Sequence, residues 1–324
     1  MNLKSQLSKL NFWLGRNPQI QKIQNPRRFI PDPYKSVFLL SADFELAWAP
    51  RYDKTHADPL EHALNRARQE RKNTPAILQL CDKFDIPITW ATVGHLMLDR
   101  CDKHPQMPRV PSYKGRFWDF SGEDWYEYDP ASDVERAPEW YAPDLVKMIL
   151  ESNTAHEIGS HTFSHIDCRD NICPDELMEA ELAACREAAA YWQIRLKSFV
   201  HPGHTIGHLD ALKNAGYTSF RTDYRNLLGY PKFHGSGLWE LPQTTEIQLR
   251  NGWSPDYHIH RYMKIIKRAL TSKTVCVFWF HPSCDPIVVE QIMPPVFAFL
   301  EEYRKDIWIT THGRYCDFLN QNQN

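Results

Sequence analysis

The chain has 324 residues, 42% of them hydrophobic, which is enough for one large domain or two ordinary ones around a packed core. Thirty-eight basic side chains nearly balance 40 acidic ones, and the net charge of −2, without a basic aromatic patch, argues against a nucleic-acid partner. We find no secretory leader and no apolar run of spanning length, so we expect a cytoplasmic, non-spanning protein whose eight scattered cysteines are reduced and mostly structural.

Residues 1–35 are predicted to be a basic N-terminal extension, with seven Lys and Arg against one Asp. Leu3, Leu7, Leu10 and Leu14 recur at helical spacing, which indicates a short amphipathic helix. One interpretation is peripheral contact of residues 1–16 with an anionic inner membrane surface. The other is a helix that packs on the domain or forms an oligomer contact.

The first strand is predicted at residues 36–42, a continuous apolar run that leads into Asp43-Phe-Glu45. A run of this kind is typical of a buried parallel strand, and ionisable residues at its carboxyl end are typical of an α/β active site. A charged helix is expected at about 57–73, with Pro75 opening a second helix to about 84.

Residues 99–141 form a long insertion that is rich in Pro, Asp and aromatic residues. Its aromatic content argues against disorder, so it either frames a substrate groove or packs over the rest of the domain.

The rest of the chain alternates strands with helices, which predicts one α/β domain over residues 36–324 with its site at the carboxyl ends of parallel strands. The further strands are expected at 86–94, 156–159, 197–200, 218–223, 237–242, 275–280 and 307–310, and the further helices at 143–152, 175–192, 209–215 and 287–303.

Two histidines, His161 and His165, stand four residues apart in a polar setting. If the residues from His161 onward are helical, both rings project from one face and can bind one metal ion. Two imidazoles and one carboxylate leave an open position for water on a divalent ion, which is the arrangement of a catalytic zinc site.

The segment Ser160-His161-Thr-Phe-Ser-His165, with Glu-Ile-Gly before it, resembles the metal-binding motif of the polysaccharide deacetylases, the NodB-homology or carbohydrate esterase family 4 superfamily. Residues 86–94 resemble the second strand of that family, and the ending at Thr310-Thr311 fits its last strand. The resemblance extends over about residues 36–315 and implies a distorted (β/α) barrel.

By this resemblance Asp43 is the general base, Glu45, His161 and His165 hold the metal, and His281 protonates the leaving amine. The family usually has two adjacent aspartates, whereas this chain has Asp43-Phe-Glu45, so either carboxylate could reach the metal. Zinc is expected, although cobalt, nickel or manganese suits the same ligands.

The third motif of the family normally contains an arginine that steadies the base, and Phe199-Val-His201-Pro-Gly-His204 has none. His201, His204 or Arg221 is the expected substitute. The residues proposed to contact the substrate are His201, His204, Trp48, Arg221, Asp223 and Trp239, although Arg221 and Asp223 could form a plain ion pair and Trp239 could belong to the core.

The expected reaction is metal-dependent removal of an N-acyl group, most simply N-acetyl, from an amino sugar of a glycan or glycan precursor. Two alternatives stay open: hydrolysis of a formyl group or another non-peptide amide, and a catalytically silent module that binds glycans.

Overall fold

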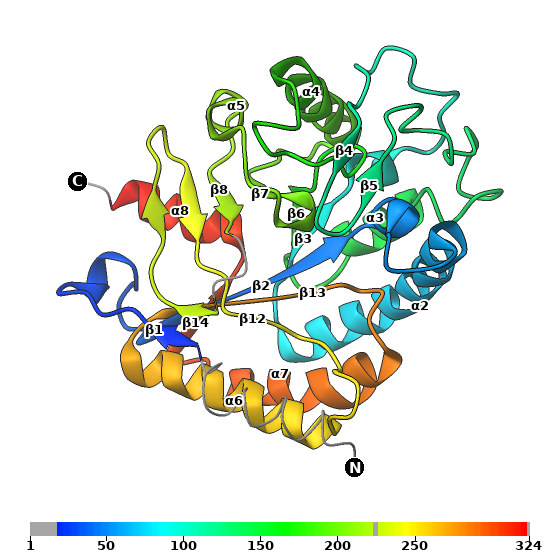
Figure 1. Cartoon of the computed structure of the whole chain (residues 1–324). Helices are drawn as coiled ribbons and strands as arrows, with labels where there is room; N and C mark the ends of the chain where they lie inside the picture. Colours follow the sequence, from blue (N-terminus) through cyan, green and yellow to red (C-terminus); the bar gives the residue numbers. More distant parts are fainter. Residues whose placement is uncertain (1–17, 223–225, 323–324) are drawn as a thin grey trace.

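A computed structural model describes residues 18–222 and 226–322 (Figure 1). The amphipathic helix expected within residues 1–16 and the candidate residue Asp223 lie outside these ranges. Among the described residues, no helix is both long enough and apolar enough to cross a lipid bilayer.

The central strand of the main sheet is β2 (Ser36–Phe44), and all of its residues are buried, as its continuous apolar sequence predicts. It pairs in parallel with β13 (Val275–Phe280) along most of its length. It also pairs with β14 (Ile307–Thr310) near its amino end and with β3 (Thr89–Thr92) near its carboxyl end. The strand that leads into Asp43 and Glu45 is therefore fixed by three neighbours.

The sheet continues from β3 through strands that pair in parallel, and it curls into an incomplete barrel (Figure 1). These strands are β6 (Glu157–Ser160), β7 (Ser198–Val200), β8 (Ser219–Arg221) and β11 (Trp239–Leu241). At this edge of the sheet, β10 (Lys232–Phe233) pairs antiparallel with β11. At the opposite edge, β12 (Thr245–Glu246) pairs in parallel with β13. The predicted distorted α/β barrel is confirmed. Its parallel strands carry their carboxyl ends to one rim.

Helices cover the outer face of this sheet (Figure 1). They are α2 (Pro59–Phe84), α3 (Pro143–Leu150), α4 (Asp175–Tyr191), α5 (Leu209–Asn214), α6 (Pro255–Ser272), α7 (Met293–Glu302) and α8 (His312–Gln321). The helix predicted at 287–303 is a π-helical turn at Val288–Ile292 that runs into α7.

The predicted break before Pro75 is wrong, because α2 continues through it as one helix. Thr74 is fully buried and donates its hydroxyl to the carbonyl oxygen of Glu70 at 2.8 Å. The buried face of α2 also continues past the proline to Ile77 and Cys81. This packing outweighs the cost of a proline in a helix, which is about 3 kcal/mol.

The insertion at 99–141 is ordered and packs against the domain. It contains a short hairpin, β4 (Tyr113–Lys114) with β5 (Asp119–Phe120), and buries several of its aromatic side chains in the main core. Trp125 donates its indole N–H to the carbonyl oxygen of Ser164 at 3.0 Å, so the insertion contacts the loop that carries the paired histidines.

The residues just before β2 also contact the domain. The two-residue strand β1 (Gln19–Ile20) pairs in parallel with β9 (Leu227–Leu228), and Ile30 belongs to a second core cluster. All eight cysteines fall within the described ranges and are free thiols.

Candidate active site

The carboxyl end of β2 presents Asp43 and Glu45, and the chain then turns through Leu46 at φ 46°. A buried carboxylate on α2, Glu70, accepts hydrogen bonds from the backbone N–H groups of Glu45 at 3.0 Å and Leu46 at 3.2 Å. Burial and the charge of Glu45 raise the pKa of Glu70 to about 8. Glu70 thus fixes the backbone direction at the point where the two candidate carboxylates leave the strand.

The two site histidines lie in a loop after β6, and the expectation that they share a helix face is wrong. Thr162 and His165 adopt positive φ angles of 58° and 62°, which an α-helix does not permit. The Glu181 carboxylate on α4 accepts from the backbone N–H groups of Phe163 at 2.7 Å and Ser164 at 2.9 Å. This buried carboxylate provides the hydrogen bonds that a helix would have provided.

The close approach of this loop to the end of β3 requires a glycine. The N–H of Gly94 donates to the carbonyl oxygen of Thr162 at 2.8 Å. A Cβ at position 94 would lie 2.8 Å from Cys185 Sγ and 3.1 Å from Phe163 Cα. Any larger residue would therefore push the histidine loop away from the sheet.

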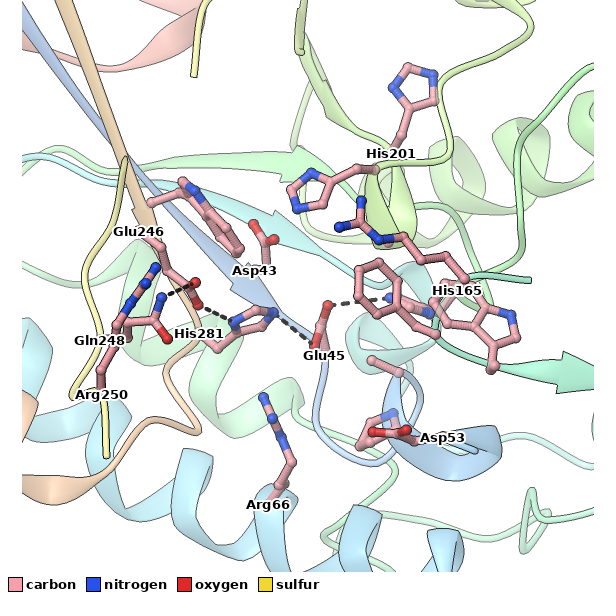
Figure 2. Close-up of a pocket in the computed structure, with 18 residues that line it drawn as sticks. Asp43, Glu45, Asp53, Arg66, His165, His201, Glu246, Gln248, Arg250 and His281 are labelled. Atoms are coloured by element: carbon pink, nitrogen blue, oxygen red, sulfur yellow. Dashed lines mark hydrogen bonds and ion pairs between the residues drawn. The ribbon is translucent and has the colours of Figure 1, made fainter. Parts of the chain in front are cut away.

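Glu45, His161 and His165 converge despite the absence of a helix, and Figure 2 shows Glu45 facing His165. Glu45 Oε1 lies 3.1 Å from His161 Nε2 and 3.3 Å from His165 Nε2, and all three side chains are buried. Their candidate ligand atoms all lie within 4.8 Å of one another. The structure thus brings the carboxylate of the first motif to both histidines of the second.

The chemistry of these three groups fits a bound cation. His161 Nδ1 lies 2.7 Å from the carbonyl oxygen of Val200, which can only accept, so Nδ1 carries the proton and the lone pair of Nε2 points toward Glu45. Two electron-rich atoms at 3.1 Å need a proton or a metal ion between them. A hydrogen bond from the other ring nitrogen to a backbone carbonyl, such as the one from His161 Nδ1 to Val200, is also the usual way in which proteins orient a histidine ligand.

The protonation states favour the same interpretation. Burial would raise the pKa of Glu45, but the neighbouring His281, His161 and His165 hold it well below its usual value. Burial lowers the pKa of His165 to about 4. A carboxylate anion beside a neutral imidazole is the form in which both residues bind a metal.

Asp43 is held by a different partner. Arg221, at the end of β8, donates to Asp43 Oδ1 at 2.7 Å and to Oδ2 at 2.6 Å, and it also donates to Ser41 Oγ at 2.9 Å. Burial would raise the pKa of Asp43, but the charge and hydrogen bonds of Arg221 keep it below its usual value. Of the three candidate substitutes for the missing arginine, Arg221 is the one that contacts Asp43 through a bidentate ion pair.

His281 follows β13 and lies on the other side of Glu45 (Figure 2). Its Nε2 is 3.7 Å from Glu45 Oε2, and its Nδ1 is 3.4 Å from Glu246 Oε1. Burial would lower the pKa of this imidazole, but Glu45 and Glu246 outweigh burial and raise the pKa to about 9. His281 is therefore a proton donor in the absence of a metal.

These groups open into a cavity of about 400 Å³. His201 and His204 line it, together with Arg116, Phe117 and Trp118 of the insertion. The ring of Trp279 also lines the cavity and packs against the guanidinium of Arg221 at 4.6 Å. The insertion thus forms part of the cavity wall, as one of its two interpretations expected.

Three candidate contact residues lie away from the cavity. Trp48 is fully buried and donates its indole N–H to the carbonyl oxygen of Trp140, so it belongs to the core. Trp239 is buried in the second core cluster and donates to Asn320 Oδ1 at 2.8 Å. Arg221 is buried against Asp43, which makes it a support for that carboxylate.

Sequence reasoning missed the carboxylates that position the site. Glu70 and Glu181 lie in helices whose composition looks like ordinary charged or alanine-rich surface, so nothing in the sequence marks them as buried. Glu246 lies on a strand of two residues that carries no apolar pattern. His281, in contrast, was predicted, because it directly follows the most apolar strand of the chain.

Residues 63–220 match the family model for polysaccharide deacetylases. Over this segment, just under half of the chain, the sequence is similar to the polysaccharide deacetylases. The matched segment includes both site histidines, while Asp43, Glu45 and His281 lie outside it and reach the site through the fold.

Solved structures of similar fold include two that are named as polysaccharide deacetylases. A structure named as a polysaccharide deacetylase from Mycobacterium smegmatis is 14% identical with a TM-score of 0.60, covering 94% of this chain and 95% of that one. A structure named in the same way from Pseudomonas aeruginosa PAO1 is 10% identical with a TM-score of 0.63, covering 94% and 96%. PuuE allantoinase is 13% identical with a TM-score of 0.64, covering 94% and 95%. No curated protein sequence matches the chain.

At these identities the structures establish a shared fold. The family match supports deacetylation of a carbohydrate, by hydrolysis of a carbon–nitrogen bond, as the general activity of the domain.

Proposed function

We propose that this chain is a metal-dependent hydrolase that removes an N-acetyl group from an amino sugar of a glycan or glycan precursor. The observation that carries the proposal is the convergence of Glu45 Oε1 on His161 Nε2 and His165 Nε2, with Asp43 held separately by Arg221. One carboxylate thus faces the two imidazoles while the other stays outside that group.

Glu45, His161 and His165 would hold the ion, with zinc as the first candidate and cobalt, nickel or manganese as others that suit these ligands. A bound divalent ion supplies Lewis acidity, which polarises an acyl carbonyl and makes water more acidic. Val200 supports this assignment because its carbonyl oxygen fixes the tautomer of His161.

Asp43 is assigned as the general base that accepts the proton of the attacking water. Arg221 occupies both of its oxygens with hydrogen bonds and so orients the carboxylate and keeps it ionised. Arg221 is a positioning residue in this scheme because it acts through Asp43.

His281 is assigned as the acid that protonates the leaving amine. Glu246 contacts its Nδ1, and Gln248 donates to the other oxygen of Glu246 at 2.7 Å. Glu246, itself held by Gln248, thus fixes the orientation of the imidazole ring. The base and the acid both lie beside Glu45, and the three side chains bring their polar atoms within 4.8 Å of one another, so one bound amide can reach both proton-transfer groups.

The test is metal analysis of the purified chain combined with acetate release from N-acetylated amino sugars, free and in nucleotide- or lipid-linked form. We expect bound metal and acetate release that a chelator stops and added metal restores. A chain that retains metal but hydrolyses no amide would support a glycan-binding module in place of an enzyme. Failure of the wild-type chain to bind metal would exclude the metal-dependent reaction.

A second candidate is hydrolysis of a small amide that is not part of a sugar, such as a formyl or cyclic amide. The bounded cavity of about 400 Å³, closed on one side by Arg116, Phe117 and Trp118, favours it over an open groove for a polymer. The same panel therefore includes N-formyl amino sugars and small cyclic amides. Release of formate, or opening of a ring, without acetate release would favour this candidate.

A further inference from the structure

A second group of potential ligands lies behind the histidine loop and outside the cavity. It consists of His95, which lies in the helical turn Gly94–Met97 that follows β3, and of Cys101, His104 and Asp129 of the insertion. His95 Nε2 lies 3.0 Å from His104 Nε2, and each of these nitrogens lies 3.4 Å from Asp129 Oδ2. Cys101 Sγ lies 3.3 Å from the same Oδ2 atom.

These separations match a tetrahedral metal site. Ligands at zinc distances of about 2.0 Å for nitrogen and oxygen and about 2.3 Å for sulfur stand roughly 3.3–3.5 Å apart at tetrahedral angles. Four donors of three chemical types, drawn from residues 95 to 129, lie within 4.8 Å of one another, and the four separations given above are 3.0–3.4 Å. Two histidines, one thiol and one carboxylate are all ligands that zinc accepts.

Hydrogen bonds alone do not satisfy the Nε2 atoms of His95 and His104 and the Oδ2 atom of Asp129 at the same time. If one imidazole donates its Nε2–H to the other across 3.0 Å, the lone pair of the acceptor also faces the Asp129 carboxylate. If both nitrogens carry protons, both can donate to Asp129 Oδ2, but 3.4 Å is long for a hydrogen bond to a carboxylate. A cation at the centre removes both conflicts.

Asp129 is oriented as a ligand by its other oxygen. Oδ1 accepts from the Tyr141 hydroxyl at 3.1 Å and from the backbone N–H of Ala131 at 3.0 Å. Oδ2 is thereby directed at His95, His104 and Cys101. Supporting hydrogen bonds of this kind are common around metal ligands.

The number of donors and the position outside the cavity distinguish this group from the site described above. The side chains of His95, His104 and Asp129 are 0%, 5% and 2% exposed, and aromatic rings surround them. None of the four residues lines the cavity described above, and four protein donors fill the four positions of a tetrahedral ion. That combination is typical of a structural ion.

We propose that His95, Cys101, His104 and Asp129 hold a structural zinc ion that fastens the insertion to the end of β3. Binding exchanges the Cys101 thiol proton, which leaves to solvent, for a zinc–thiolate bond. The ion also supports the histidine loop. The N–H of His95 donates to the carbonyl oxygen of Phe163 at 3.0 Å, and the rings of His95 and His104 lie 5.5 Å and 5.2 Å from the Phe163 ring.

The first test is the metal content of the full chain purified with zinc. We expect about two ions per chain for the wild type, one for Cys101→Ser, one for His161→Ala and none for the double variant. Cys284→Ser is the matched control, because Cys284 is also a half-buried free thiol and is expected to leave both ions in place.

Cobalt substitution provides a second readout that is independent of activity. A thiolate on Co²⁺ gives a near-ultraviolet charge-transfer band, and Cys101 is the one cysteine in a candidate cluster among residues 18–222 and 226–322. The band is expected in the wild type, His161→Ala and Cys284→Ser, and is expected to be lost in Cys101→Ser.

If Cys101→Ser does not fold, as judged by circular dichroism, Asp129→Asn takes its place, since it keeps the side-chain shape. We expect Asp129→Asn to lose zinc to a chelator at least about 10-fold more readily than the wild type. A wild-type chain with one ion, lost in His161→Ala, and with no thiolate band in its cobalt form overturns the proposal.

Discussion

The protein contains two groups of buried histidines and carboxylates that differ in what surrounds them. Glu45, His161 and His165 stand at the wall of a cavity, with Asp43 and His281 beside them. The group of His95, Cys101, His104 and Asp129 is enclosed by aromatic rings and includes a thiol. The first has three donors and room for a reactant, and the second has four donors and no room.

One short loop separates the two groups. The side chains of His161 and His165 face Glu45, while Phe163 between them packs against His95 and His104. The difference teaches that the number of donors and the access to a cavity, rather than the residue types, distinguish a reactive site from a structural one. Five substitutions test this distinction.

The largest expected effect is that of His161→Ala. Removal of one of three donors is expected to empty the cavity site and reduce amide hydrolysis to background, while the group at His95 keeps its metal. Metal content and acetate release measure the two outcomes. Full turnover in a variant that lacks the cavity metal would contradict the ligand assignment.

Asp43→Asn separates the two carboxylates of the cavity site. Asparagine keeps the shape but cannot accept the proton of water, so turnover is expected to fall by about 10²–10⁴-fold with the metal retained. Metal analysis and kcat measure this result. If Asp43→Asn instead empties the site, the roles of Asp43 and Glu45 must be exchanged.

Arg221→Met leaves the Asp43 carboxylate buried without its partner. Loss of one member of a buried ion pair is expected to cost about 3–5 kcal/mol of unfolding free energy. Arg221→Lys keeps the charge but not the bidentate contact, so we expect it to recover part of the stability. Urea denaturation measures both variants, with Arg186→Met, at an exposed position on α4, as the control. Equal stability of Arg221→Met and the control would contradict a buried ion pair.

Glu181→Gln tests whether the histidine loop depends on a carboxylate outside the cavity. An amide can replace only part of the contacts to Phe163 N–H and Ser164 N–H, so metal affinity of the cavity site is expected to fall about 10-fold. Chelator competition measures the affinity. Glu187→Gln, exposed on the same helix, is the control, and identical affinities in the two variants would count against this role.

The smallest expected effect is that of Phe117→Ala. Phe117 lines the cavity with a ring that is 38% exposed, so its loss removes a contact surface without opening the core. We expect KM to rise a few-fold, in keeping with roughly 1 kcal/mol for an aromatic contact, with kcat unchanged. Phe233→Ala is the matched control because Phe233 is 41% exposed and is not part of the cavity wall. An unchanged KM would exclude this residue as a substrate contact.

The sequence was sufficient to predict the class of fold and the residues that the site brings together. Apolar runs such as residues 36–42 and 275–280 are local signals for buried strands, and Asp43, Glu45 and His281 follow them directly. Parallel strands carry such residues to one rim, so the convergence followed from the order of elements.

The supporting contacts could not be predicted, because they depend on residues that are distant in the sequence. Arg221, 178 positions from Asp43, was one of three candidates that the sequence could not separate, and Glu181 supports a loop that local spacing had indicated as helix. Trp48 and Trp239 were candidate substrate contacts, with the core as the alternative for Trp239, and both side chains are buried in the core. Helix α6 went unpredicted although Tyr262, Ile265 and Ile266 mark its buried side.

The position of Asp43 at the end of β2 has a consequence for hydrogen exchange. Because β2 is entirely buried and pairs with β13, β14 and β3, its amide protons are expected to exchange only when the whole domain opens. The hairpin of the insertion has two residues in each strand and is expected to open by itself far more often. Deuterium uptake on ligand binding should therefore change in the insertion and remain constant in the strand that leads to Asp43 and Glu45.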